Sequence, residues 1–443
     1  MDSTNGEQTN RCHVMALPYP GRGHINSMMN LCKFIASRSH DILITFVVTE
    51  EWLGFIGSNS KPANIRFATI PNVVPSELVR GADVQGFIKA TQTKMEEPFE
   101  LLLDRLEPPV NLIIADIILI WPVKVGNQRN IPVALLWPMS ASVFSINYHF
   151  DLDQNRHFPV DLSEGGEERL DSIPGIYSIR IADLPPNLHQ APRCVVSLVS
   201  KAQYLLFASI YELESQAIDA LKPKIPCPVY SLGPAIPYFK SKETYNECLD
   251  YLKWLDSQPP SSVLYISLGS FLSVSSTQMD EIAAGLRLCG VRYLWVAREE
   301  TSRLKEGGCG GSGMVVPWCD QLRVLCHPSI GGFWTHCGWN SIMESIFAGV
   351  PLITFPICVD QFTNSKLIVE DWKIGWKMNA EVKREEIGGL VQRFMDLDSA
   401  ERTEMVKRAT ELQKICQQAI VKGGSSETNL DDFVGKFSQC LDI

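Results

Sequence analysis

Histidine, tryptophan, asparagine and serine crowd one short turn in the second half of the chain. Residues 335–341 read Thr-His-Cys-Gly-Trp-Asn-Ser. An apolar run ends at His336, Gly338 permits a tight turn, and we expect a helix to start near Asn340. The free N–H groups and the macrodipole of such a helix N-terminus favour an anion. His336, Asn340 and Ser341 would add side-chain donors, so the turn predicts a phosphate site.

A simpler structural interpretation of the same turn stays open. Ser341 and Glu344 have the spacing of a capping box, in which two side chains satisfy backbone N–H groups in the first turn of a helix. A capping box does not account for the histidine, tryptophan and asparagine beside it. We therefore expect binding chemistry here, with capping as the alternative for these two side chains.

His24 and Asp116 form a second candidate pair, in the first half of the chain. His24 lies in a turn directly after an apolar run at 12–18, and open α/β sheets bind ligands at the carboxyl ends of their strands. Asp116 interrupts another apolar run, where burying an unpaired carboxylate is costly. If the two strands are neighbours, Asp116 can orient the imidazole of His24 as a general base. A helix cap at the end of the strand is the alternative for Asp116.

Three other patterns carry weaker signals. The turn at 20–26 resembles a dinucleotide fingerprint, but Asn26 stands where the third glycine is needed. The glycine-rich segment 307–313 precedes a strand and opens no helix, so we interpret it as a surface loop. Zinc binding is disfavoured because adjacent strand residues point to opposite faces. The residues in question are Cys319, Cys326, His327, His336 and Cys337.

The elements that must position these residues follow a strand–helix pattern that occurs twice. Near-continuous apolar strands alternating with helices predict parallel sheets covered on both faces. In the first half we expect a helix at 24–37 and strands at 12–18, 42–48, 65–70, 112–116 and 133–137. In the second half we expect a helix at 277–289, ended by Gly290, and strands at 263–268, 293–297, 314–316, 330–335 and 352–355. A proline-containing stretch at 233–260 is the expected connection.

Length and composition exclude several classes of protein. The 443 residues are too many for one compact core. The net charge of −10 argues against nucleic acid or an anionic membrane as the main partner. The strongest apolar run, 111–121, is shorter than the ~20 residues of a membrane span. Thirteen cysteines without a Cys-x-x-Cys pair, and no signal peptide, favour a cytoplasmic protein. We expect a monomer without a transmembrane segment. Peripheral association with intracellular membranes stays open.

Residues 318–361 resemble the C-terminal signature box of the plant family 1 UDP-dependent glycosyltransferases, which modify small molecules. The box opens on Trp-Cys-Asp-Gln at 318–321 and closes on Asp360-Gln361. Shorter similar segments extend the resemblance along nearly the whole chain; they lie at 23–26, 232–234, 254–256 and 267–270. The resemblance implies an α/β protein of the GT-B fold, with two facing Rossmann-like domains, parallel sheets and a cleft between the domains.

The same resemblance implies the domain boundaries. An acceptor-binding domain would span 1–235, and a linker 236–260 would lead to a UDP-sugar-binding domain at 261–425. A final helix within 426–443 would pack back on the first domain.

The resemblance also implies a role for each site residue. His24 would be the catalytic base and Asp116 its partner. Trp318 would stack on uracil, Glu344 would bind the ribose hydroxyls, and Asp360 would contact the sugar. The full UDP-sugar site would consist of Ser270, Trp318, Cys319, Gln321, His336, Trp339, Asn340, Ser341, Glu344, Asp360 and Gln361. Three features depart from the family pattern: Ser27 replaces a proline, Cys319-Asp320 replaces Ala-Pro, and the segment before the first strand has no match.

The implied activity is inverting transfer of a hexose from a UDP-sugar to a hydroxyl of a small lipophilic acceptor, giving a β-O-glycoside. Glutamine at the end of the box, Gln361, favours UDP-glucose as the donor. The acceptor class is open among flavonoids, other phenolics, terpenoids and hormones, and no metal ion or other cofactor is expected. Two alternatives are a nicotinamide-dependent oxidoreductase, which needs a complete glycine fingerprint, and a nucleotide-sugar-binding protein without turnover.

Overall fold

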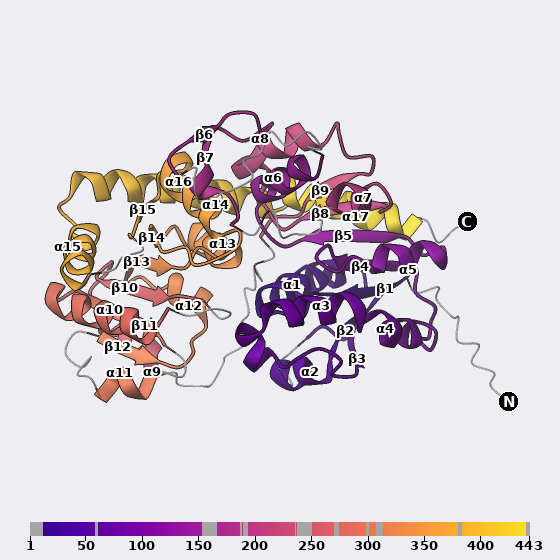
Figure 1. Cartoon of the computed structure of the whole chain (residues 1–443), viewed down its shortest axis with the longest axis horizontal. Helices are drawn as coiled ribbons and strands as arrows, with labels where there is room; N and C mark the ends of the chain where they lie inside the picture. Colours follow the sequence, from indigo (N-terminus) through magenta and orange to yellow (C-terminus); the bar gives the residue numbers. More distant parts are fainter. Residues whose placement is uncertain are drawn as a thin grey trace. The chain divides into compact units, whose positions relative to one another are not determined.

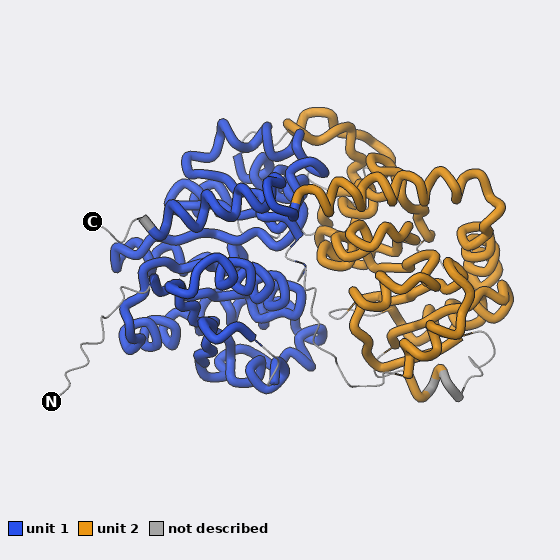
Figure 2. Tube along the Cα trace, turned by 180° about the vertical axis from the view of Figure 1, so that it is seen from behind, with its two compact units in different colours: residues 1–152, 192–237, 420–443 blue, residues 153–191, 238–419 orange. Residues whose placement is uncertain are grey.

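The chain forms two compact units, which Figure 2 shows in different colours. The computed structural model describes residues 12–57, 61–152, 166–186, 188, 194–234, 236, 250–269, 274–297, 301–306, 313–379 and 383–439. Unit 1 comprises residues 1–152, 192–237 and 420–443, and unit 2 comprises 153–191 and 238–419. Each unit is built around its own parallel sheet.

The sheet of unit 1 has seven strands in the order β3-β2-β1-β4-β5-β8-β9, and every neighbouring pair is parallel. The strand order reverses between β1 and β4, so these two strands lie side by side at the switch point. The strands are β1 (Cys12–Leu17), β2 (Ile42–Thr49), β3 (Ile65–Ile70), β4 (Leu112–Asp116), β5 (Val133–Trp137), β8 (Tyr204–Phe207) and β9 (Val229–Ser231).

Helices cover both faces of this sheet (Figure 1). They are α1 (Arg22–Arg38), α2 (Glu50–Ile56), η1 (Glu77–Ala82), α3 (Val84–Thr93), α4 (Glu96–Leu103), α5 (Pro122–Gln128), α6 (Ala141–Leu152), α7 (Val195–Val199), α8 (Tyr211–Leu221) and α17 (Ser425–Gln439).

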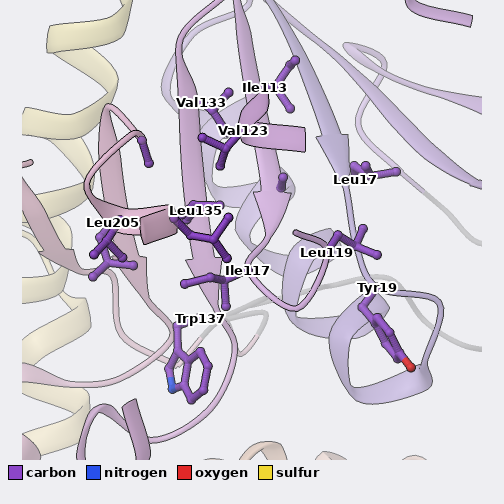
Figure 3. Packing of buried hydrophobic residues seen from close by; sticks show 14 of the residues in the cluster. Leu17, Tyr19, Ile113, Ile117, Leu119, Val123, Val133, Leu135, Trp137 and Leu205 are labelled. Carbon is purple, nitrogen blue, oxygen red and sulfur yellow. The ribbon is translucent and has the colours of Figure 1, made fainter. Parts of the chain in front are cut away.

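Alternate residues of each central strand enter two separate apolar clusters, as a parallel sheet covered on both faces requires. On one face, Leu17, Ile113, Leu135 and Leu205 extend from four neighbouring strands (Figure 3). On the other face the cluster includes residues of β1, β2 and α1 together with Phe433 of α17. Helix α17 therefore completes the core of unit 1, although it follows unit 2 in the sequence.

The sheet of unit 2 has six parallel strands in the order β12-β11-β10-β13-β14-β15. Its order reverses between β10 and β13. The strands are β10 (Val263–Ser267), β11 (Arg292–Val296), β12 (Gly313–Val316), β13 (Ile330–Thr335), β14 (Leu352–Thr354) and β15 (Gly375–Lys377). The glycine-rich segment that precedes β12 lies outside the described residues, apart from Gly313.

The helices of unit 2 include the one expected at 277–289, which ends at Gly290 with a φ of 64°. The helices are α9 (Asp250–Asp256), α10 (Ser276–Cys289), α11 (Thr301–Glu306), α12 (Gln321–Leu325), α13 (Trp339–Ala348), α14 (Gln361–Lys366), the π-helical turn η4 (Leu367–Asp371), α15 (Arg384–Met395) and α16 (Ala400–Ile420). Among the described residues, no helix is both long and apolar enough to cross a membrane.

One segment lies in a different unit from the one that its sequence position suggests. Residues 153–191 were expected within the first domain, yet they cluster with unit 2. The described part contains β6 (Arg169–Leu170), β7 (Ile179–Arg180) and η2 (Ile181–Asp183). Its attachment is specific, because Arg180 pairs with Glu370 at 3.1 Å and the Thr363 hydroxyl donates to the Asp183 carbonyl at 2.7 Å.

Candidate functional site

Two groups of predicted site residues lie where a sheet reverses its strand order. His24 follows β1 and Asp116 ends β4 in unit 1, whereas Gly269 follows β10 and His336 follows β13 in unit 2. The carboxyl ends of strands at such a switch point are the ordinary place for a ligand in an open α/β sheet. Each unit thus has a candidate site of its own at its switch point.

The structure brings His24 and Asp116 into contact. His24 Nδ1 lies 2.7 Å from Asp116 Oδ2, with the aspartate fully buried and 24% of the histidine side chain exposed. Asp116 Oδ1 accepts a hydrogen bond from the Ile118 N–H at 3.0 Å. The carboxylate therefore holds both the turn after β4 and the imidazole. Because a carboxylate beside Nδ1 favours a proton there, Nε2 is left as the basic nitrogen.

Aromatic rings pack beside this histidine. The ring of Tyr19 lies 5.1 Å from that of His24 and 5.9 Å from that of Phe87. Burial raises the pKa of Tyr19 to about 12. Its phenol therefore stays neutral near pH 7 and does not compete with His24 as a base.

In unit 2, His336 is seated between two glycines. A Cβ atom at Gly269 would lie 2.9 Å from His336 Cδ2, and one at Gly338 would lie 2.5 Å from His336 Nε2. Gly269 also has a φ of +97°, which side chains rarely tolerate. Cys337, between His336 and Gly338, has a φ of 68°. The close packing of His336 and the positive φ of Cys337 fix the conformation of the turn that leads from β13 into α13.

The capping-box alternative for Ser341 and Glu344 is wrong. Helix α13 begins at Trp339, and its N-cap, Gly338, makes no side-chain capping bond. Both side chains instead accept hydrogen bonds from Gln321 Nε2, with 3.0 Å to Ser341 Oγ and 2.8 Å to Glu344 Oε2. Three predicted donor-site residues are therefore joined by one amide group.

Tyr265, the central residue of β10, extends this network. Its hydroxyl donates a hydrogen bond to Gln321 Oε1, at a distance of 3.2 Å. Burial raises the pKa of Glu344 from its ordinary 4.5 to about 7, although the bond from Gln321 lowers it. A partly desolvated carboxylate of this kind is suited to accept hydrogen bonds from two neighbouring hydroxyls of a ligand.

The segment that opens the signature box presents one side chain and buries the next. Trp318 is 62% exposed, so its indole is available for stacking. The Cys319 thiol is buried 3.4 Å from the Tyr265 hydroxyl, and burial raises its pKa to about 12. Asp320 caps α12, since its Oδ1 accepts from the Arg323 N–H at 3.2 Å. The Cys-Asp departure from the family pattern therefore serves local structure, and the Cys319 thiol does not point outward to a ligand.

The residues that close the box are buried and already engaged. Asp360 and Gln361 are 8% and 9% exposed. Asp360 makes no side-chain capping bond to α14. Gln361 Oε1 accepts from the N–H groups of Ile357 and Cys358, at 2.8 and 2.9 Å. Gln361 thus closes its own loop, in which Val359 has a φ of 52°.

Two further predicted residues lie in the first turn of α13. Trp339 is buried, with its ring 6.3 Å from that of Trp372, and Asn340 is half-buried beside it. Ser270 lies outside the described residues.

Sequence reasoning missed three residues that support the site. Tyr265 contacts Gln321, the Tyr251 hydroxyl accepts from the Asp320 N–H at 3.0 Å, and Asn364 contacts Asp360. Tyr265 and Tyr251 approach through tertiary contacts that no spacing reveals. Asn364 had a signal, because residues four apart on a helix are neighbours.

Within the described ranges, no group of three or more His, Cys, Asp or Glu side chains is arranged to hold a metal ion. His327, one of the residues weighed for zinc, contacts Ser329 and Asp256 through its two ring nitrogens, at 2.8 and 3.1 Å.

The chain is similar to several known proteins. A family model described as UDP-glucoronosyl and UDP-glucosyl transferase matches residues 180–399. UDP-glycosyltransferase 87A1 of Arabidopsis thaliana is 52% identical over 434 residues, which cover 94% of this chain and 98% of that protein. The 7-deoxyloganetin glucosyltransferase of Catharanthus roseus is 31% identical, covering 97% of each chain. The crystal structure of Medicago truncatula UGT71G1 complexed with UDP-glucose superposes with a TM-score of 0.83 at 25% identity, covering 97% of this chain and 99% of that one.

Proposed function

The chain belongs to the plant family 1 UDP-glycosyltransferases, and from this premise we propose that it transfers glucose from UDP-glucose to a hydroxyl group of a small lipophilic acceptor. It is a glycosyltransferase of the GT-B fold, as the related solved structures are. The observation that carries the proposal is the 2.7 Å contact between His24 and the buried Asp116.

The acceptor hydroxyl needs a base, because an alcohol or phenol is a weak nucleophile near neutral pH. His24 Nε2 takes the hydroxyl proton as the acceptor oxygen bonds to the anomeric carbon. Asp116 stabilises the resulting imidazolium through Nδ1. The bond from the anomeric carbon to the UDP oxygen breaks on the opposite face, and its electron pair leaves with UDP. Configuration at the anomeric carbon is therefore inverted.

The leaving diphosphate gains negative charge, which unit 2 is arranged to meet. His336 lies three residues before α13 and Ser341 lies in its first turn, and the free N–H groups of a helix N-terminus favour an anion. Preorganised donors of this kind stabilise charge that develops in a transition state. The proposal assigns this task to the chain's own groups and includes no metal ion.

Glucose is the proposed donor sugar because Asp360 and Gln361 close the box. A carboxylate beside an amide can accept from and donate to adjacent sugar hydroxyls. Two relatives support this choice: one is named a glucosyltransferase, and another was crystallised with UDP-glucose. Pterostilbene in the complex of the 26% identical Phytolacca americana UGT2 supports a phenolic among the candidate acceptors.

A screen of acceptors tests the proposal directly. The purified protein is incubated with UDP-glucose and a library of flavonols, simple phenols, terpenoid alcohols and hydroxylated hormones, and products are read by mass spectrometry. We expect an acceptor plus one hexose, with a β-anomeric coupling by NMR. His24→Ala is the matched control, and it should form no product yet bind UDP as wild type does. UDP binding without product from any acceptor would contradict the proposed transfer.

The donor is tested separately, with one accepted compound. Values of kcat/KM for UDP-glucose should exceed those for UDP-galactose and UDP-glucuronate, since a site that hydrogen-bonds a hydroxyl discriminates against donors that leave its groups unpaired. A preference for either rival donor would refute glucose. Because Gln361 also closes the loop at 357–358, Gln361→His needs a stability measurement beside its donor ranking.

A further inference from the structure

Asn364 lies between two separate parts of the donor site. It is fully buried in α14, and its Nδ2 group donates to the Cys337 carbonyl at 3.0 Å and to Asp360 Oδ2 at 2.7 Å. Cys337 belongs to the turn that carries His336, and Asp360 belongs to the loop that would contact the sugar. We propose that Asn364 is a positioning residue that fixes the sugar-binding carboxylate relative to the diphosphate-binding turn. This inference rests on the proposed function.

The chemistry of the amide suits a bridge between two acceptors. An amide nitrogen carries two hydrogens, and here each is directed to a different oxygen. The other atom of the same amide, Asn364 Oδ1, is buried without a hydrogen-bond partner among the described residues. Leaving such an oxygen unsatisfied costs about 1–3 kcal/mol. An aliphatic side chain here would avoid this cost, but it would supply neither of the two hydrogen-bond donors.

The neighbours of Asn364 already attach α14 to the rest of unit 2. On one side, the buried Thr363 hydroxyl donates to the Asp183 carbonyl in η2 at 2.7 Å. On the other side, the buried Ser365 hydroxyl donates to Thr354 Oγ1 in β14 at 2.8 Å. Docking of the helix thus has its own hydrogen bonds. What Asn364 adds is the link between Cys337 and Asp360.

That link bears on function because one end, Cys337, and the residue before the other end have unusual backbone. Cys337 has a φ of 68° and Val359, directly before Asp360, has a φ of 52°. Backbone of this kind persists only where surrounding contacts hold it. Without the bridge, the turn and the loop can relax independently. A displacement of about 1 Å in a binding group can cost on the order of a hundredfold in rate.

Binding measurements without an acceptor test the bridge. Isothermal titration calorimetry gives Kd for UDP-glucose and for UDP. The Kd for UDP-glucose divided by the Kd for UDP isolates the sugar's contribution to binding. Asn364→Ala should raise this ratio by roughly tenfold or more, equivalent to about 1.4 kcal/mol. Thr363→Ala is the matched control, because it removes an adjacent buried polar group from the same helix, and it should stay within about twofold of wild type.

Two more variants separate positioning from simple loss of packing. Asn364→Asp keeps the shape but loses both amide donors, so it should raise the ratio as Asn364→Ala does, and it replaces that variant should the alanine fail to fold. In an Asp360→Ala background, Asn364→Ala should change the ratio less than about twofold, since the group it positions is gone. An unchanged ratio in Asn364→Ala, an equal rise in Thr363→Ala, or additive effects with Asp360→Ala would each overturn the inference. Failure of the wild type to bind UDP-glucose would instead overturn the proposed function.

Discussion

At the scale of single residues, Asp116 has two tasks that one substitution can separate. In Asp116→Asn the new amide can still accept from the Ile118 N–H, so the turn after β4 is kept. It can also donate to His24 Nδ1, which would place the histidine proton on Nε2, where it blocks proton acceptance. By analogy with hydrolase triads, we expect kcat to fall by about four orders of magnitude with little change in thermal stability. Steady-state kinetics measure kcat, and a thermal melting curve measures stability. A kcat equal to that of the wild type would show that Asp116 has only a structural role.

Glu344 links pH to stability through its raised pKa. The carboxyl has an ordinary pKa of 4.5 when unfolded and about 7 in the fold, so between these values the folded state binds more protons. Stability therefore falls as pH rises through this window. The shift corresponds to about 3 kcal/mol at most, and partial exposure reduces this figure.

Glu344→Gln removes this titration while its amide oxygen can still accept from Gln321. The variant should be more stable than wild type at pH 8 and similar at pH 4.5, as urea unfolding at both values would show. Its affinity for UDP should fall, because the ribose hydroxyls lose a carboxylate. A stability difference that is the same at both pH values would show that ionisation of Glu344 is not its cause.

At the scale of elements, the turn from β13 into α13 depends on the contact between a glycine and a histidine. Gly338→Ala places a methyl group 2.5 Å from the present position of His336 Nε2, and the φ of −64° at this residue adds no backbone strain. His336 is half-buried and can move aside. We therefore expect little loss of stability but at least a tenfold weaker Kd for UDP, measured by calorimetry.

Gly389→Ala is the control for a glycine-to-alanine change as such. A Cβ at Gly389, inside α15, would have no heavy atom within 4 Å. This variant should bind UDP normally and gain up to about 1 kcal/mol of stability from helix propensity. Equal UDP affinity in the Gly338→Ala and Gly389→Ala variants would show that UDP binding does not depend on the contact between Gly338 and His336.

The sequence predicted elements well where apolar runs were long and turns were marked by glycine. The strands that precede His24 and His336, and the strand that ends at Asp116, were predicted within a residue or two. The strands β8, β9 and β15, of three or four residues each, were not anticipated. The contact between Tyr265 and Gln321 could not be predicted either, because the centre of β10 and the start of α12 come together only in the folded protein. The Gln321 network shows the same limit, as spacing indicated a capping box that the fold does not form.

At the scale of the whole molecule, α17 binds a unit whose other parts precede it by a long stretch of sequence. Phe433 is fully buried, with its ring 5.3 Å from that of Tyr204 and 5.7 Å from that of Tyr230. Phe433→Ala should lower the free energy of unfolding by about 3–5 kcal/mol, the usual cost of truncating a buried aromatic. Chemical denaturation monitored by fluorescence would measure this loss. A change below about 1 kcal/mol would mean that α17 contributes little to the core of unit 1.

This return of the chain to its first unit has a consequence for biosynthesis. While a ribosome translates residues 238–419, the surface of β9 and α1 that α17 will contact has no covering helix. At ordinary rates of translation this interval lasts roughly ten seconds or longer. The nascent first unit therefore presents an apolar surface to the cell during that time, and unit 2 can mature before it. Unit 1 can therefore reach its final state only after the last residues of unit 2 have been synthesised.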